Sequence, residues 1–226
     1  MKKSPSSSLA PPLASQVQEE ILNITLHGFG LLLSLIGFGT LVGLAVQSQS
    51  LTKIFAASTY CATLIVMYIG SLLFHTSLAV DVPWKKALEV VDHSAIYLLI
   101  AGSYTPFLMV SLHNTKSWIM LGLIWLIAVI GVLYKVFFFY KSDALSTLAY
   151  VAMGWMCVFF MKDLYQSIGW QGLGLLGAGG VLYTVGSLFY LFDHKFKYAH
   201  AIWHLFVRAG SLCHYLSVFF FVILPE

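Results

Sequence analysis

Charged side chains are scarce in this sequence. Asp, Glu, Lys and Arg together make up 9% of the 226 residues, whereas 59% are hydrophobic. A soluble domain carries about 25% charged residues, which it needs to cover its surface. With a mean hydropathy of +0.86, most of the outer surface is expected to face lipid. The composition therefore excludes an ordinary soluble globule and predicts an integral membrane protein.

Paired cysteines and basic clusters are also lacking. Cys61, Cys157 and Cys213 each lie in an apolar run, and none belongs to a CxxC pair, so no disulfide framework is expected. The net charge is only +3, and the lysines stand singly or in pairs between apolar runs. This pattern fits loops beside a membrane and argues against a nucleic-acid partner. Membrane lipids are the expected partners, and no protein partner is indicated.

Residues 1–18 are rich in Ser, Pro and Ala and lack hydrophobic periodicity. We predict a disordered N-terminal tail. Lys2 and Lys3 resemble the start of a signal peptide, but no apolar core follows them directly, and the first apolar run is too long for a signal. Residues 19–226 are predicted to form one transmembrane domain.

The apolar runs predict an all-α bundle of seven transmembrane helices. Each approaches the length of about 20 residues that a crossing needs. The runs are 21–46, 54–79, 87–111, 117–139, 144–161, 170–192 and 201–224. The fifth is the shortest. The glycines of GLGLLGAGG (172–180) lie within the sixth, where close helix packing explains them better than phosphate binding.

The lysines predict the orientation, since loops on the cytoplasmic side carry an excess of them. Eight lie in the N-terminal segment and in the loops after the second, fourth and sixth runs, whereas Lys53, Lys116 and Lys162 lie on the other side. This places the N-terminus in the cytoplasm and the C-terminus outside, the reverse of G-protein-coupled receptors.

Polar clusters fall at one membrane depth. Ionisable side chains near a helix centre each cost about 2.5–3.5 kcal/mol on insertion and therefore need partners. The first, third and seventh runs begin at the cytoplasmic side and the second ends there, so their polar residues share one level. These residues are Glu20, Asn23 and His27; Ser71 and His75; Glu89, Asp92 and His93; and His200, His204 and Arg208.

Three histidines and a carboxylate at one level predict a zinc site, although imidazole accepts other divalent ions. We expect His75, His200 and His204 as ligands, with Asp92 orienting or deprotonating a bound water. A structural zinc site is normally closed by a fourth protein ligand. We expect no fourth histidine or cysteine at this depth, which leaves Asp92 as the alternative fourth ligand.

From Glu20 to its C-terminus the chain resembles the hemolysin III family, the bacterial branch of the progestin and adipoQ receptor superfamily. The resemblance rests on ExxNxxxH (20–27), SxxxH (71–75), VDHSAIYLLIAGSYTPF (91–107), and HxxxH (200–204) leading to AGSLCHY. It implies a seven-helix bundle in the bacterial plasma membrane with a cytoplasmic N-terminus. It also implies zinc on His75, His200 and His204, with Asp92 contacting the metal's water.

The superfamily is linked to hydrolysis of lipid amides, as in ceramidases, and its bacterial branch is named for haemolytic activity. The leading hypothesis is a zinc hydrolase of a membrane-embedded amide or ester. Asp92 would accept a proton, and Ser71 would donate a hydrogen bond to the developing oxyanion. The rival is a non-enzymatic protein affecting permeability or signalling, with structural zinc. A lytic pore needs polar residues along a whole helix face, which these runs lack.

Arg208 departs from the apolar residue that the resemblance leads us to expect. An arginine inside a span needs a partner. We expect it to pair with Glu20, to bind a lipid phosphate, or to extend outward to the head groups.

Overall fold

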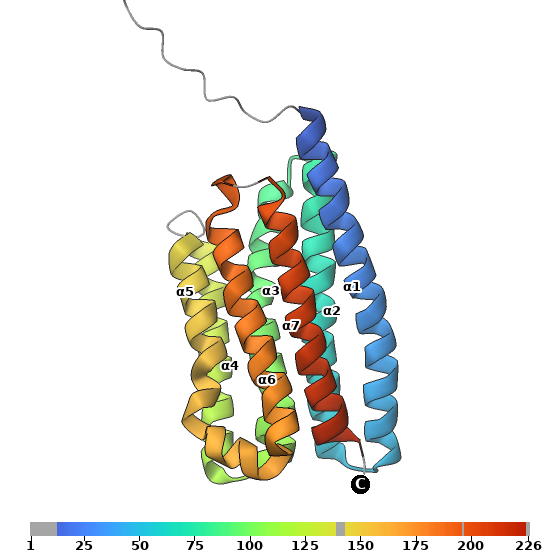
Figure 1. Cartoon of the computed structure of the whole chain (residues 1–226), viewed down its shortest axis with the longest axis vertical. Helices are drawn as coiled ribbons and strands as arrows, with labels where there is room; N and C mark the ends of the chain where they lie inside the picture. The colour runs from blue at the N-terminus through green and yellow to red at the C-terminus, as the bar shows by residue number, and fades with distance from the viewer. Residues whose placement is uncertain (1–12, 139–142, 196, 225–226) are drawn as a thin grey trace, which may run out of the picture.

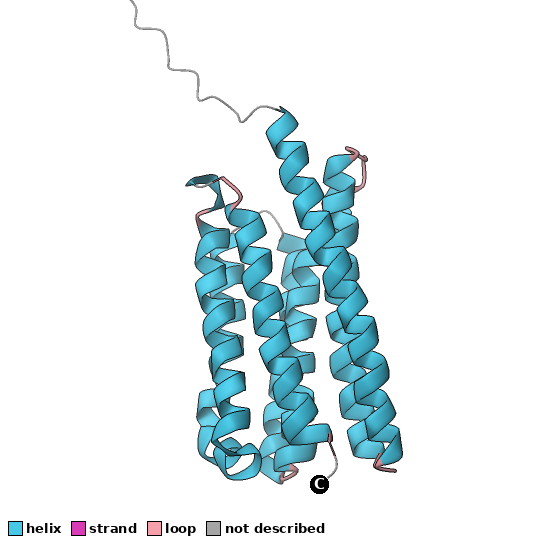
Figure 2. Cartoon of the chain, turned by 45° about the vertical axis from the view of Figure 1, so that its right-hand side comes forward, coloured by secondary structure: helices cyan, strands magenta, loops and turns pink. Residues whose placement is uncertain are grey.

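The computed structural model describes residues 13–138, 143–195 and 197–224, and within these ranges all regular structure is helical. Figures 1 and 2 show an elongated bundle in which the first helix begins and the last helix ends at opposite ends. The helices are α1 Leu13–Gln47, α2 Leu51–Ala79, α3 Lys85–Pro106, α4 Thr115–Phe138, α5 Asp143–Gly154, α6 Met161–Leu191 and α7 Ala199–Val218. Two π-helical turns, Phe107–Leu112 and Phe219–Ile223, and two 3₁₀ turns, Trp155–Phe160 and Asp193–Lys195, extend or join them.

Helix α1 begins at Leu13, inside the segment predicted to be a disordered tail. Residues 1–12 of that tail lie outside the described residues.

Six stretches of the described residues are long and apolar enough to cross a membrane, where the sequence predicts seven. The difference lies in Asp143–Leu191, one 49-residue stretch in which helical turns continue from α5 into α6. Its backbone leaves helical geometry at Phe160 (φ −133°) and at Gly169 (φ +65°), and the second is a left-handed conformation that favours glycine. Figure 1 shows α5 running toward the end of the bundle where α7 ends and α6 returning beside it. The stretch folds back at these breaks without a separating loop.

Hydrogen bonds from neighbouring helices stabilise the end of α5. The Tyr104 hydroxyl on α3 donates to the Gly154 carbonyl oxygen at 2.5 Å and accepts from the Cys157 amide at 2.9 Å. These are backbone groups that a helix end leaves without partners. The Trp155 indole N–H donates to Thr184 Oγ1 of α6 at 2.9 Å. The fold-back is therefore anchored to α3 and α6.

The burial pattern is that of a protein in lipid. Large apolar side chains such as Leu32 and Ile36 on α1 stay more than half exposed, whereas His75, Asp92 and His204 are buried. Exposed apolar surface on this scale is rare on soluble monomers, but it is what a hydrocarbon environment selects.

Glycines let α6 and α7 approach closely. Gly172, Gly179 and Gly186 are seven residues apart and buried on one side of α6. A Cβ on Gly179 would lie 2.3 Å from Cδ2 of His214, and one on Gly186 would lie 2.6 Å from Cβ of Phe206. The prediction that the run 172–180 serves helix packing is confirmed for Gly172 and Gly179, whereas Gly174 and Gly177 have no heavy atom within 4 Å of their Cβ positions; small residues are typical of membrane helix contacts.

Gly179→Ala is therefore expected to lower the thermal stability of the purified protein. The added methyl group overpacks the contact with His214, which typically costs about 1–3 kcal/mol. Gly174→Ala is the matched control, because no heavy atom lies within 4 Å of its Cβ position and alanine favours helix. A melting temperature that Gly179→Ala leaves at or above the control value would contradict this account of the contact.

Candidate metal centre

Four helices bring their polar clusters together near one end of the bundle, as the shared depth predicts. α1 supplies Glu20, Asn23 and His27 from its first half. His75 lies in the last turns of α2, and α3 begins at Lys85, with Asp92 two turns along it. α7 supplies His200 and His204 from its first turns.

The closest group of possible metal ligands consists of His27, His75 and His204. One nitrogen from each of these buried rings lies within 4.8 Å of the others. Nε2 of His75 and Nε2 of His204 are 3.0 Å apart. The His27 ring stacks on His75 at 5.4 Å between centroids and meets His204 edge-on at 4.1 Å. Three imidazoles thus converge from α1, α2 and α7.

Glu20 orients His75 within this group. Oε2 of Glu20 lies 2.7 Å from Nδ1 of His75. An ionised carboxylate only accepts, so His75 donates from Nδ1, and its Nε2 keeps a lone pair facing Nε2 of His204. A carboxylate behind a histidine is the usual partner of a metal-ligating imidazole. This arrangement fits a cation that binds both Nε2 atoms.

His27 gives an independent test of that fit. It is 2% exposed, and neither ring nitrogen has a hydrogen-bond partner among the described residues. A buried polar group without a partner is expensive, and each one calls for an explanation. A metal ion between the three rings would take one of the two His27 nitrogens, so the donor set fits a metal, and zinc is an ion that imidazole commonly binds.

His200 lies next to this group. Its ring centroid is 4.6 Å from His204 and 5.3 Å from His75, while its Nδ1 lies 3.6 Å from Oδ2 of Asp193. The predicted ligands His75, His200 and His204 are thus brought together, but the closest set contains His27 in place of His200. Our expectation of no fourth histidine at this depth is wrong. The ExxNxxxH spacing places His27 on the same helix face as Glu20, and this spacing could have identified His27 as the fourth histidine at this depth.

Asp92 and Ser71 form a pair beside the histidines. Ser71 Oγ donates a hydrogen bond to Oδ1 of Asp92, and both side chains are buried. Since a hydroxyl has one proton, the Ser71 proton is directed at the carboxylate in this structure. Both residues line the same cavity as His27, His200 and His204.

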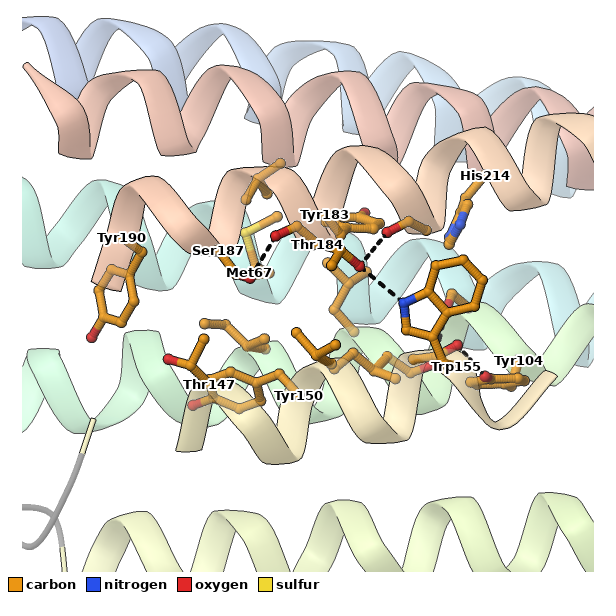
Figure 3. A pocket seen from close by; sticks show the side chains of 18 of the residues that line it. Met67, Tyr104, Thr147, Tyr150, Trp155, Tyr183, Thr184, Ser187, Tyr190 and His214 are labelled. Atoms are coloured by element: carbon orange, nitrogen blue, oxygen red, sulfur yellow. Dashed lines mark hydrogen bonds between the residues drawn. The ribbon is translucent and has the colours of Figure 1, made fainter. Parts of the chain in front are cut away.

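An apolar cavity of about 140 Å³ opens from this site into the bundle. His27, Asp92, His200 and His204 line one part of it. The lining residues of α7 extend from His200 to His214. At the ordinary rise of an α-helix these two residues are about 21 Å apart along the helix. Figure 3 shows aromatic and hydroxyl side chains that line the cavity, including Tyr150 of α5, Trp155 of the turn after it and Tyr183 of α6. The cavity thus joins a polar end to a long apolar interior.

Arg208 is not paired with Glu20, so that one of its three expected alternatives is not found. Its Nη2 donates to the carbonyl oxygen of Leu26, and its guanidinium carbon lies 5.4 Å from the centroid of the Phe29 ring. Glu20 instead accepts from His75. Sequence spacing placed Arg208 on the stripe of His200 and His204 but did not identify α1 backbone as its partner.

Fold and site together define a class: an integral membrane protein, all-helical in its described residues, with a buried histidine cluster at one end of an internal cavity. The family model for haemolysin-III related proteins matches residues 15–215. The chain is 40% identical to hemolysin-3 of Bacillus cereus over 207 residues, covering 92% of this chain and 93% of that protein. It is 38% identical to the hemolysin-3 homolog of Bacillus subtilis (strain 168), covering 92% and 96%.

A human relative is more distant. The monocyte to macrophage differentiation factor of Homo sapiens is 29% identical over 208 residues, 88% of this chain and 83% of that protein. The chain belongs to the haemolysin III family, and the resemblance given by its motifs is confirmed. It is an integral protein of the plasma membrane.

The role of Glu20 predicts a change in metal affinity. Glu20→Gln is expected to weaken zinc binding about 10–100-fold, the usual effect of removing a partner behind a ligating histidine. Equilibrium competition with a chelator in detergent measures the dissociation constant. Asp163→Asn is the control, because it removes an exposed carboxylate from the first turn of α6, at the end of the bundle away from the histidines. Equal affinities in the two variants would mean that Glu20 does not support the site.

Proposed function

We propose that this protein is a zinc-dependent hydrolase of a lipid amide or ester in the membrane. The observation that carries the proposal is the position of the histidine cluster and Asp92 at the polar end of a long apolar cavity. A metal site in that position presents its chemistry to the head of a lipid whose acyl chain lies within the bundle. Concave, mostly apolar sites with a few converging polar groups are the usual form of small-molecule sites.

His75, His200 and His204 would hold the zinc. When bound, zinc lowers the pKa of a water to about 7 and so supplies hydroxide at neutral pH. Asp92 accepts the proton of the attacking water and passes it to the leaving amine or alcohol as its bond to the carbonyl carbon breaks. Ser71 holds the carboxylate in place and, once Asp92 is protonated, is free to donate toward the oxyanion. The products are a carboxylic acid and an amine or alcohol.

We also infer that Asp143–Leu191 crosses the membrane twice, which gives seven crossings with a cytoplasmic N-terminus. Residues 143–160 and 170–191 each come close to the length of about 20 residues that a crossing needs. Of the lysines in the described residues, five lie at the histidine end of the bundle (Lys85, Lys86, Lys135, Lys195 and Lys197) and three lie near the starts of helices at the other end (Lys53, Lys116 and Lys162). The excess of lysines at the histidine end supports a cytoplasmic location for it.

Cysteine labelling tests this topology. Single cysteines are placed at exposed positions Trp84, Leu51 and Trp170 in a variant whose native cysteines are alanine. In intact cells a membrane-impermeant maleimide should label positions 51 and 170, whereas position 84 should react only after the membrane is opened. A Trp170→Cys variant that is protected under both conditions would favour a single crossing by Asp143–Leu191.

A non-enzymatic role with structural metal is the second candidate, and one observation favours it. His75 and His204 each have ring contacts with both His27 and His200, and four protein ligands are typical of closed structural zinc sites. In that case the ion stabilises the bundle. Because a relative is named hemolysin, membrane permeability is the property to measure.

Asp92→Asn distinguishes the two candidates. For the hydrolase, the variant should keep its zinc and lose about 10²–10⁴-fold in hydrolysis, the usual contribution of a general base. Purified protein is incubated with a total lipid extract, with and without a chelator, and released fatty acids are measured by mass spectrometry. Loss of zinc and of thermal stability in the variant would instead identify Asp92 as a structural ligand. Release by the parent that neither the chelator nor the substitution reduces would refute the hydrolase.

A further inference from the structure

The cavity has a polar group at the end that the proposed chemistry does not use. His204 lines the end with the histidine cluster, whereas His214 lines the other end, which we call the far end. Ten residues separate the two histidines along α7, which is about 15 Å at the ordinary rise of an α-helix. The wall of the cavity is mostly apolar. His214 is therefore an isolated polar side chain deep in an apolar space and well away from the histidine cluster.

A hydrogen bond fixes which nitrogen of the His214 ring is free. Nε2 lies 3.2 Å from the carbonyl oxygen of Leu176 on α6. A carbonyl oxygen only accepts, so Nε2 donates, and Nδ1 of the neutral ring keeps a lone pair. Nδ1 has no hydrogen-bond partner among the described residues. Unlike the ring nitrogens of His27, it is not enclosed by protein, so a molecule in the cavity can reach it.

Two consecutive glycines of α6 make room for the rings at the far end. A Cβ on Gly179 would lie 2.3 Å from Cδ2 of His214, and one on Gly180 would lie 3.6 Å from Cζ2 of Trp155. The Tyr183 ring meets the His214 ring edge-on at 5.3 Å between centroids. Figure 3 shows these rings among the side chains that line the cavity. The contacts hold the imidazole in one orientation, so its acceptor nitrogen has a fixed position.

Neighbouring polar side chains at the far end already have partners in the protein. The Trp155 indole donates to Thr184 Oγ1 at 2.9 Å, and the Thr184 hydroxyl donates to a backbone carbonyl oxygen of α6. The Tyr104 hydroxyl donates to the backbone at the end of α5. These groups do not compete for Nδ1 of His214. The far end thus offers a hydrogen-bond acceptor to a ligand that carries a donor.

We propose that His214 selects acyl chains that carry a hydroxyl group far from their carbonyl carbon. This inference rests on the proposed function and names its substrate class. When the carbonyl carbon lies at the histidine cluster, a chain that follows α7 places such a hydroxyl near His214, where it donates to Nδ1. An unsubstituted chain covers Nδ1 with methylene groups and leaves it without a partner. Sites with a hydrogen-bonding group of this kind discriminate against ligands that cannot pair with it.

Native mass spectrometry of the purified protein in detergent measures this preference without any hydrolysis. The protein receives equal amounts of stearic acid and of stearic acid hydroxylated beyond the middle of its chain, and the ratio of the two bound acids is recorded. We expect an excess of the hydroxylated acid of about 10-fold, the upper end of what one hydrogen bond contributes. Stearic acid hydroxylated next to its carboxyl group should show no such excess, because that hydroxyl stays at the end with the histidine cluster.

Three variants assign the preference to the acceptor nitrogen. His214→Phe keeps a ring but loses the acceptor, so it should bind stearic acid and its hydroxylated analogue equally. His214→Gln has an amide that donates to Leu176 and also accepts, and it should keep part of the preference. Ser217→Ala is the matched control and should keep the parental ratio. Ser217 also donates from α7 to a carbonyl oxygen of α6, that of Gly172 at 2.9 Å, but it is not among the residues that line the cavity.

The outcomes separate this inference from the proposed function. Equal binding of the two acids by the parent would overturn the inference and leave the hydrolase standing, and so would an excess that persists in His214→Phe. A parent that prefers the hydroxylated acid but releases no fatty acid from the lipid extract would support His214 as a binding residue and overturn the hydrolase. The comparison of hydroxyl positions in the parent decides the question even if His214→Phe does not fold.

Discussion

A histidine or carboxylate inside a membrane has no water to bond with, so other side chains, backbone groups or an ion must satisfy it. The chain meets this constraint at one end of the bundle. Glu20 accepts from His75, Ser71 donates to Asp92, and Arg208 donates to backbone of α1. The arrangement of α1, α2, α3 and α7 follows from bringing these groups together, because any helix displaced from the bundle would leave buried polar atoms without partners.

Apolar packing alone would not fix the helices so closely, since lipid tails are as apolar as the side chains they would replace. Close contact comes from glycine. Gly30 admits the ring of Tyr68 beside the histidine cluster, and Gly179 admits His214 at the far part of the cavity. These contacts set the positions of α1 and α7, the two helices that bring His27 and His204 to the site.

Whether the proposed metal catalyses or stabilises depends on how many imidazoles reach it. Three ligands with Asp92 nearby leave a place for water, while a fourth from α1 fills that place. The structure keeps both options in one site: the cavity leads to Asp92 from inside the bundle, and His27 approaches from the outermost helix. Membership of the haemolysin III family is compatible with either chemistry.

The sequence by itself determined the membrane setting, the approximate helix bounds and the common depth of the polar clusters, because hydrophobic length and helical spacing are local properties. It also predicted one common site for His75, His200, His204, Asp92 and Ser71. Only the tertiary structure decided which partners they take. The contacts of His27 with His75, and of Arg208 with Leu26, depend on how helices far apart in the sequence rotate about their axes. That rotation is set by packing between helices, which no single segment encodes.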